Sequence, residues 1–155
     1  MLVKNNLEVF QATINTGTIY ARYLGAHRMD IVISNPIELM LEVIEIDEHL
    51  PSLHFDVKIR SNIFYYDCEI NSKIWIECCH IDNFIASIKK EDIAILKDFN
   101  DCFELRINST EGWLEWSCSK EDLDGCSTSS KGREKIDTES KLEIYEAFND
   151  FPKWW

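Results

Sequence analysis

Strict alternation of apolar and polar side chains over short segments is the feature that most constrains the fold of this chain. Residues 54–60, 102–108 and 113–118 all alternate in this way. A period of two puts every second side chain on the same face of an extended strand, so all three segments are predicted to be β-strands. Their apolar members are Phe55, Val57 and Ile59 in the first, Phe103, Leu105 and Ile107 in the second, and Leu114, Trp116 and Cys118 in the third.

Aromatic and β-branched residues predict a hairpin in the middle of the chain. Residues 63–70 and 73–77 are rich in these residue types and flank Asn71 and Ser72. Asn and Ser tolerate turn geometry, so we expect two strands joined by a tight turn at these two residues.

Two further turn regions indicate a mainly antiparallel sheet. Residues 108–112 end in Gly112 and predict the turn between the strands at 102–108 and 113–118. Near the amino end, short turns separate three segments, so a meander is the simplest topology there. These segments are residues 7–15, 19–24 and 29–34.

A helix is predicted to begin at Asn35. Asn35 is a suitable cap, Pro36 suits the first helical position and Glu38 suits the third. The β-branched residues that follow keep a strand open as the alternative.

Two other helices have clearer signals. Asp82 can cap a short helix that ends at Lys89 and Lys90. A second helix is expected to begin at Asp137 or Thr138 and to end before Pro152. Its expected apolar face consists of Leu142, Tyr145, Phe148 and Phe151.

Composition favours one folded domain over residues 1–155. The chain has 155 residues, 45% of them hydrophobic, which is enough for one core. Residues 118–136 contain almost nothing to bury and are expected to form a long polar loop. The predicted fold is α+β, a mainly antiparallel twisted sheet with two or three helices packed on it.

The cysteines are expected to be reduced and partly buried. Most of the six lie in alternating apolar segments, where free cysteine behaves as a small hydrophobic residue. The run Cys78-Cys79-His80 resembles a metal site, but adjacent side chains on a strand point to opposite faces and no C-x-x-C pair accompanies them. Packing is the favoured interpretation and metal binding the alternative, so no cofactor is expected.

Net charge points toward a protein partner. The chain has 16 Lys and Arg against 28 Asp and Glu, a net charge of -12. Such a field repels nucleic acid and anionic membranes and attracts basic proteins. It also raises the pKa of thiols, so catalysis by a cysteine nucleophile is not expected. Residues 1–6 show no signal-peptide pattern, which predicts a cytoplasmic protein.

Two acidic segments with a local balance of -6 are expected to bind that partner. The first, residues 38–56, has no Lys or Arg, and the second, residues 98–124, also contains two tryptophans. Trp beside carboxylates suits a partner's Arg or Lys. Trp154 and Trp155 are expected either to pack on the core or to contact the partner. The predicted binding residues are Glu38, Glu42, Glu45, Asp47, Glu48, Glu111, Trp113, Glu115, Trp116, Glu121, Asp122 and Asp124.

A small acidic α+β chain with Trp-rich strands and no catalytic motif resembles a bacterial immunity protein, the antitoxin encoded beside a contact-dependent or other polymorphic toxin. The resemblance rests on the predicted hairpin at 64–77, the helix at 82–90 and the strands through Phe103 and Trp116. It implies tight inhibition of a cognate toxin domain, commonly a basic nuclease. An acidic adaptor without a toxin partner, a structural or regulatory domain, and an enzyme are the alternatives.

Overall fold

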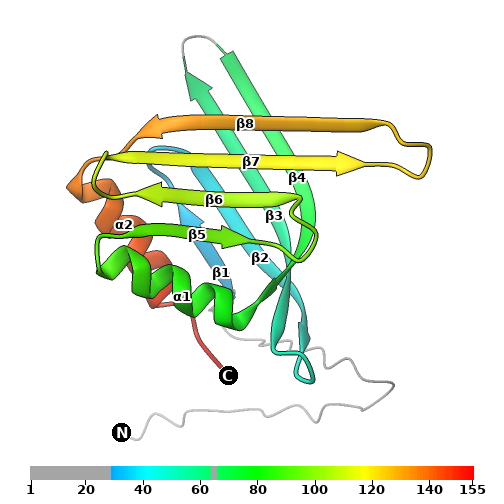
Figure 1. Ribbon diagram of the computed structural model, residues 1–155, viewed down its shortest axis with the longest axis horizontal. Coiled ribbons are helices and arrows are strands. Elements are labelled where there is room, and N and C mark those ends of the chain that lie inside the picture. Colours follow the sequence, from blue (N-terminus) through cyan, green and yellow to red (C-terminus); the bar gives the residue numbers. More distant parts are fainter. Residues whose placement is uncertain (1–28, 64–65) are drawn as a thin grey trace, which may run out of the picture.

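The computed structural model describes residues 29–63 and 66–155 as two four-stranded antiparallel sheets and two helices (Figure 1). In both sheets, strands that are consecutive in the chain are hydrogen-bonded neighbours, which confirms the predicted α+β class with mainly antiparallel strands. The first sheet contains β1 (Asp30–Ile33), β2 (Glu38–Asp47), β3 (Ser52–Ile63) and β4 (Tyr66–Glu77). The second contains β5 (Ile93–Lys97), β6 (Phe103–Asn108), β7 (Trp113–Glu121) and β8 (Ser127–Lys135).

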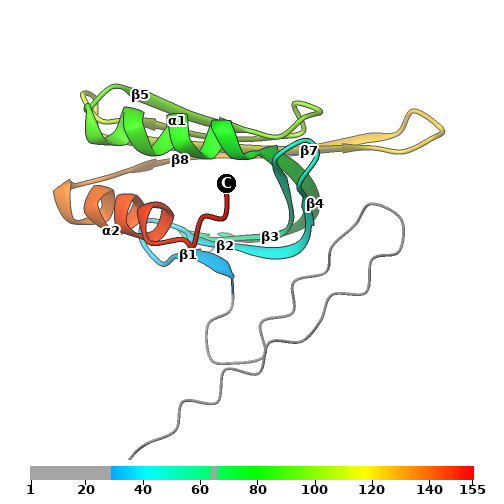
Figure 2. The same ribbon diagram turned by 90° about the horizontal axis from the view of Figure 1, so that it is seen from below.

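The two helices pack against each other and against one edge strand of each sheet. α1 (Cys78–Lys89) follows β4 directly and leads into the second sheet, and α2 (Thr138–Asn149) follows β8. α1 packs against β5 and α2, and α2 packs against β1. Figure 2 shows the sheets as two layers, with the helices along one side of them. The first and last described elements are therefore neighbours.

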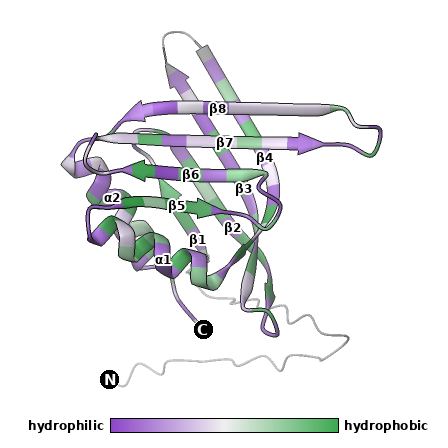
Figure 3. Ribbon diagram, viewed as in Figure 1, coloured by the Kyte–Doolittle hydropathy of each residue, from purple (hydrophilic) through white to green (hydrophobic). Residues whose placement is uncertain are grey.

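One hydrophobic core fills the space between the layers. The inward side chains of the alternating strands supply most of it, and Phe55 and Val57 of β3 are fully buried. Phe84 of α1 meets Phe148 of α2 edge-on, with ring centroids 4.8 Å apart. Each large side chain buried in this way stabilises the fold by about 1.5–3 kcal/mol. In Figure 3 the hydrophobic and hydrophilic colours alternate along the core strands, as the sequence pattern requires.

Several predicted elements are confirmed. The three alternating segments lie in β3, β6 and β7, and Gly112 closes the β6–β7 turn with a φ of 71°, which glycine adopts without strain. The segment at 29–34 contains β1, whereas the expected strands at 7–15 and 19–24 lie outside the described residues.

The helix predicted to begin at Asn35 is wrong, because residues 38–47 form β2. Leu39 and Leu41 alternate into the core, and a bulge between Val43 and Glu45 shifts the register so that Ile46 also points inward. β2 is paired on both sides, and its β-branched residues suit a pleated surface. Sheet pairing therefore overrides the local capping pattern.

The turn predicted at Asn71 and Ser72 is also wrong. β4 is continuous, and these two residues pair with Lys58 and Val57 of β3. The chain reverses between β3 and β4 instead. Asn71 is tolerated inside a strand because its side chain is exposed on the outer surface of the sheet.

Most of the polar loop predicted at 118–136 is strand. β7 continues to Glu121 and β8 occupies residues 127–135, so only a short turn separates them. In Figure 1 this hairpin extends beyond the rest of the second sheet. β8 pairs on one side only and contains no buried residue, so its sequence lacks the alternation that reveals a core strand.

The two remaining helices are present with altered details. α1 begins at Cys78, so Asp82 lies inside the helix and does not cap it. α2 begins at Thr138, one of the two predicted starting residues, and Asp137 is its N-cap. Leu142 is 53% exposed, however, and the side of α2 that meets the core contains Ile144 and Phe148. Neither helix, within the described ranges, is long and apolar enough to cross a membrane.

Candidate functional site

The outer surface of the first sheet carries a strong excess of carboxylates. Along β2, Glu38 and Glu42 point away from the core while Leu39 and Leu41 point into it. We call the outward charged residues of this sheet the acidic face. Apart from Glu77 at the end of β4, its acidic members are Asp30, Glu38, Glu42, Glu45, Asp47, Asp56, Asp67 and Glu69, and its basic members are Lys58, Arg60 and Lys73.

Carboxylates occupy adjacent positions across three strands of this face. Glu42 of β2 lies in register with Asp30 of β1 and with Asp56 of β3. Directly opposed like charges destabilise a sheet. Neither Glu42 nor Asp56 forms an ion pair with another residue in the described part of the chain. Both carboxylates are therefore available to form an ion pair with a basic side chain of a partner.

Aromatic and apolar side chains lie among these charges. His54 stacks on Trp75 with ring centroids 4.6 Å apart and planes inclined by 8°, and its Nδ1 lies 3.4 Å from Glu45 Oε2. Val32 is 51% exposed on β1, beside the partly exposed Met40 of β2. Trp and Met are enriched in protein interfaces, so the face offers contact area as well as charge.

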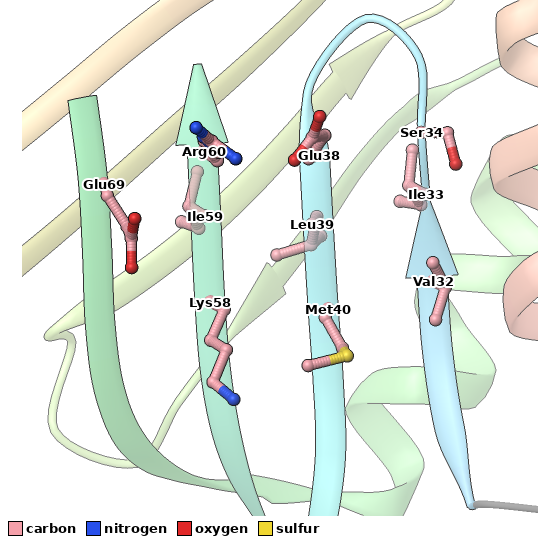
Figure 4. A pocket seen from close by; sticks show the side chains of 10 residues that line it. All are labelled: Val32, Ile33, Ser34, Glu38, Leu39, Met40, Lys58, Ile59, Arg60 and Glu69. Atoms are coloured by element: carbon pink, nitrogen blue, oxygen red, sulfur yellow. The ribbon is translucent and has the colours of Figure 1, made fainter. Parts of the chain in front are cut away.

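A depression of about 380 Å³ lies on the same surface (Figure 4). Val32 and Met40 supply apolar walls, and Glu38, Arg60 and Glu69 supply charged ones. These side chains come from all four strands of the first sheet. The depression can receive a partner's side chain if that side chain contains both apolar and charged groups.

The outer surface of the second sheet contains several internal ion pairs. The guanidinium of Arg133 lies 4.1 Å from the ring centroid of Trp113, and Arg133 also pairs with Glu115 at 3.3 Å and with Glu111 at 3.9 Å. The outward strand residues include the acidic Glu104, Glu115 and Glu121 and the basic Lys97, Arg106, Lys131, Arg133 and Lys135. β8 thus places three basic residues beside the acidic side chains of this surface.

The remaining predicted site residues are dispersed. Trp116 is 4% exposed and belongs to the core, so it offers no surface to a partner. Glu121, Asp122 and Asp124 lie at the end of the β7–β8 hairpin, where Asp122 Oδ1 accepts the backbone N–H groups of Asp124 and Cys126 at 3.0 and 2.8 Å.

At the β2–β3 turn, Asp47 Oδ1 similarly accepts the backbone N–H groups of His49 and Leu50, and Glu48 is exposed beside it. The two predicted acidic segments lie on different sheets, on outer surfaces that face away from each other (Figure 2). The structure does not bring them together.

The acidic face also contains residues that sequence reasoning missed. Asp30, His54 and Trp75 join it only through strand pairing, because they lie on β1, β3 and β4. The alternation of residues 54–60 was a usable signal, since it already placed His54 and Asp56 opposite the apolar side.

All six cysteines are free. Burial, together with the nearby Asp82 carboxylate, raises the pKa of the Cys78 thiol to about 12. Partial burial and Glu77 raise the pKa of the Cys79 thiol. Both thiols are therefore protonated at neutral pH, which makes them poor nucleophiles.

No protein-family model, curated protein or solved structure was found to match this chain.

Proposed function

We propose that this protein is an immunity protein, an antitoxin that neutralises a toxin domain with a basic surface, and that the toxin binds the acidic face. The contrast between the two sheets carries the proposal. Glu104 and Glu115 on the outer surface of the second sheet are ion-paired, whereas Glu42 and Asp56 on the first form no ion pair with another described residue. Like charges placed together at a cost in stability are expected where a partner supplies the opposite charge.

A nuclease toxin suits this surface because its groove must be basic to hold phosphates. Carboxylates arranged across the sheet can occupy such a groove in place of nucleic acid. Long-range attraction also speeds association, toward about 10⁸–10⁹ M⁻¹s⁻¹ at low salt. An inhibitor that acts in the cytoplasm of the cell it protects benefits from that speed.

Gene context and growth rescue test the function directly. The gene is expected to lie beside a gene for a large secreted toxin, and coexpression of the two is expected to restore growth. Coexpression that leaves the toxin fully active contradicts the proposal. A salt-sensitive complex with a different basic protein, without rescue, favours the acidic adaptor instead.

Charge reversal tests the face. The double variant Glu42→Lys/Asp56→Lys is expected to slow association with the toxin domain about tenfold or more at low salt, and to reduce the salt dependence of that rate. Glu121→Lys/Asp124→Lys is the matched control, because it changes the net charge equally at the exposed end of the β7–β8 hairpin. Stopped-flow mixing at several salt concentrations gives both rates. If the two variants slow association equally, the acidic face is not the surface that binds the toxin.

A further inference from the structure

Three side chains with metal-binding chemistry meet where β4 runs into α1. Glu77 ends β4 and is the N-cap of α1, and Cys79 and His80 lie in the first turn of the helix. A carboxylate oxygen, the Cys79 sulfur and an imidazole nitrogen all lie within 4.8 Å of one another. The Cys79 Sγ to Glu77 Oε2 distance is 3.3 Å.

We propose that Glu77, Cys79 and His80 form a binding site for Zn²⁺. A zinc ion lies about 2.3 Å from a thiolate sulfur and about 2.0–2.2 Å from nitrogen and oxygen ligands, so its ligand atoms lie within about 4 Å of one another. The three atoms need only small side-chain rotations to reach that spacing. Sulfur and imidazole ligands select zinc over Mg²⁺ and Ca²⁺, which prefer oxygen.

Helical geometry makes the site possible. On a strand, Cys79 and His80 would point to opposite faces, which argued against a shared ion. In the first turn of α1, Cys78 instead points into the core, while Cys79 is exposed and His80 is partly exposed. Both side chains can then converge with Glu77. The adjacency of Cys79 and His80, which would separate their side chains on a strand, therefore does not exclude a shared ion on a helix.

Electrostatics at this position depends on Glu77. A helix N-terminus carries partial positive charge and by itself disfavours a cation. The Glu77 side chain does not cap α1 and is hydrogen-bonded to Cys79 instead. The first turn contains no acidic residue, so Glu77 is the carboxylate placed to offset the helix dipole.

The surroundings leave room for a fourth ligand. Glu77 and Cys79 also line a hollow of about 340 Å³ whose other walls include Leu50, Phe99 and Trp155. Three protein ligands with an open fourth position are typical of zinc sites that bind a water or an external ligand. An ion held here would lie at the edge of an apolar hollow.

Cobalt titration tests the site, because Co²⁺ replaces Zn²⁺ and reports a sulfur ligand by a charge-transfer absorption band. The reduced full-length protein is expected to show this band, to saturate at one equivalent and to lose the band when Zn²⁺ is added. Cys79→Ser is expected to abolish the band, and His80→Gln is expected to weaken binding more than about tenfold. Cys126→Ser, which changes an exposed cysteine on the β7–β8 turn, is the matched control.

Thermal unfolding of the apo variants verifies that each remains folded. The proposal is overturned if the wild-type protein shows no sulfur-to-cobalt band. It is equally overturned if the band survives in Cys79→Ser and disappears in Cys126→Ser. Glu42→Lys/Asp56→Lys is expected to keep full cobalt binding, which separates this site from the acidic face.

Discussion

Gly132 allows the edge strand β8 to cover a tryptophan. It lies in register with Trp116 of β7, and a Cβ built at Gly132 would lie 2.4 Å from the Trp116 Nε1 atom. The indole therefore packs directly on the Gly132 backbone, and Trp116 is almost fully buried. The absence of a side chain at Gly132 therefore lets β8 pack against the core, although no residue of β8 is buried.

Gly132→Ala is expected to destabilise the protein by about 1–3 kcal/mol, because the added methyl group forces Trp116 or β8 to move. Urea unfolding monitored by tryptophan fluorescence measures the change. Ser129→Ala, at an exposed position of the same strand, is the control and is expected to have little effect. Equal stability of the two variants would mean that β8 adjusts without cost.

The kind of interaction that a residue can form was predictable from its residue type. The partner that it meets was not predictable where that partner depends on strand register. Trp113 beside carboxylates was predicted to receive an Arg or Lys of a partner. The structure supplies that cation from the chain itself, since Arg133 stacks on Trp113 and pairs with Glu115. Only the pairing of β7 with β8 brings these residues together, and no local pattern encodes that register.

Among the elements, those that bury an apolar stripe were the ones that the sequence predicted. β3, β6 and β7 alternate because one face is core, and α2 has a helical period and a capping Asp137. β8 was missed because an edge strand with polar residues on both faces has no such period. β2 was misassigned because pairing with two neighbours outweighed a helix-like start.

Asp137 makes the stability of α2 depend on pH. It accepts hydrogen bonds from the backbone N–H and the hydroxyl of Ser140, at 2.8 and 2.7 Å, which lower its pKa. Because the folded-state pKa lies below the unfolded value of about 3.9, the stabilisation is present above about pH 4 and is lost as the pH falls through the folded-state pKa.

Asp137→Ala is therefore expected to lower the melting temperature by a few degrees at pH 7, and the difference from wild type is expected to shrink as the solution is acidified. Asp137→Asn serves as the control, since Asn caps a helix without titrating there. Thermal scans from neutral to strongly acidic pH provide the measurement. A difference that stays constant with pH would show that the capping carboxylate is not the titrating group.

The carboxyl-terminal segment is fastened to α1 through Asp82. Lys153 Nζ and Trp155 Nε1 each lie 2.8 Å from an oxygen of that carboxylate, and the Trp155 ring lies 6.4 Å from the ring of Phe151. Trp154 is 36% exposed and contacts Trp155 edge-on. Of the two terminal tryptophans, Trp155 therefore has the contacts that join this segment to Phe151 and to α1.

Trp155→Ala is expected to reduce the free energy of unfolding by about 1–3 kcal/mol, because it removes both the contact with Phe151 and the hydrogen bond to Asp82. Trp154→Ala is expected to cost clearly less. Denaturant unfolding of the two variants gives the comparison. A larger loss for Trp154→Ala would reverse these assignments.

At the scale of the whole molecule, part of the net charge of -12 lies on the outer surface of the first sheet, whose outward charged residues are mainly acidic, whereas those of the second sheet include more basic than acidic residues. Its sign was evident from composition, but its location was not, because β8 brings basic residues to the second sheet and leaves the first unbalanced. Asp30, Glu42 and Asp56 lie next to one another across three strands of that sheet. The surface proposed for binding is therefore also a source of instability.

Glu42→Lys is expected to increase the free energy of unfolding by about 0.2–1 kcal/mol at low ionic strength, because it replaces a repulsion with an attraction to Asp56. Salt should diminish the gain. Glu121→Lys makes the same change in net charge at the hairpin end and is expected to stabilise less. Equal gains, measured by urea unfolding, would indicate a general effect of net charge.

The contact between α2 and β1 has a consequence for synthesis on the ribosome. Every strand pair within residues 29–63 and 66–155 joins neighbours in the chain, so each of these hairpins can form soon after its second strand emerges. α2 emerges after all the strands, yet it packs against the first described strand. Until then Ile31 and Ile33 of β1 lack their helical cover, and the nascent protein presents an apolar surface that chaperones can recognise.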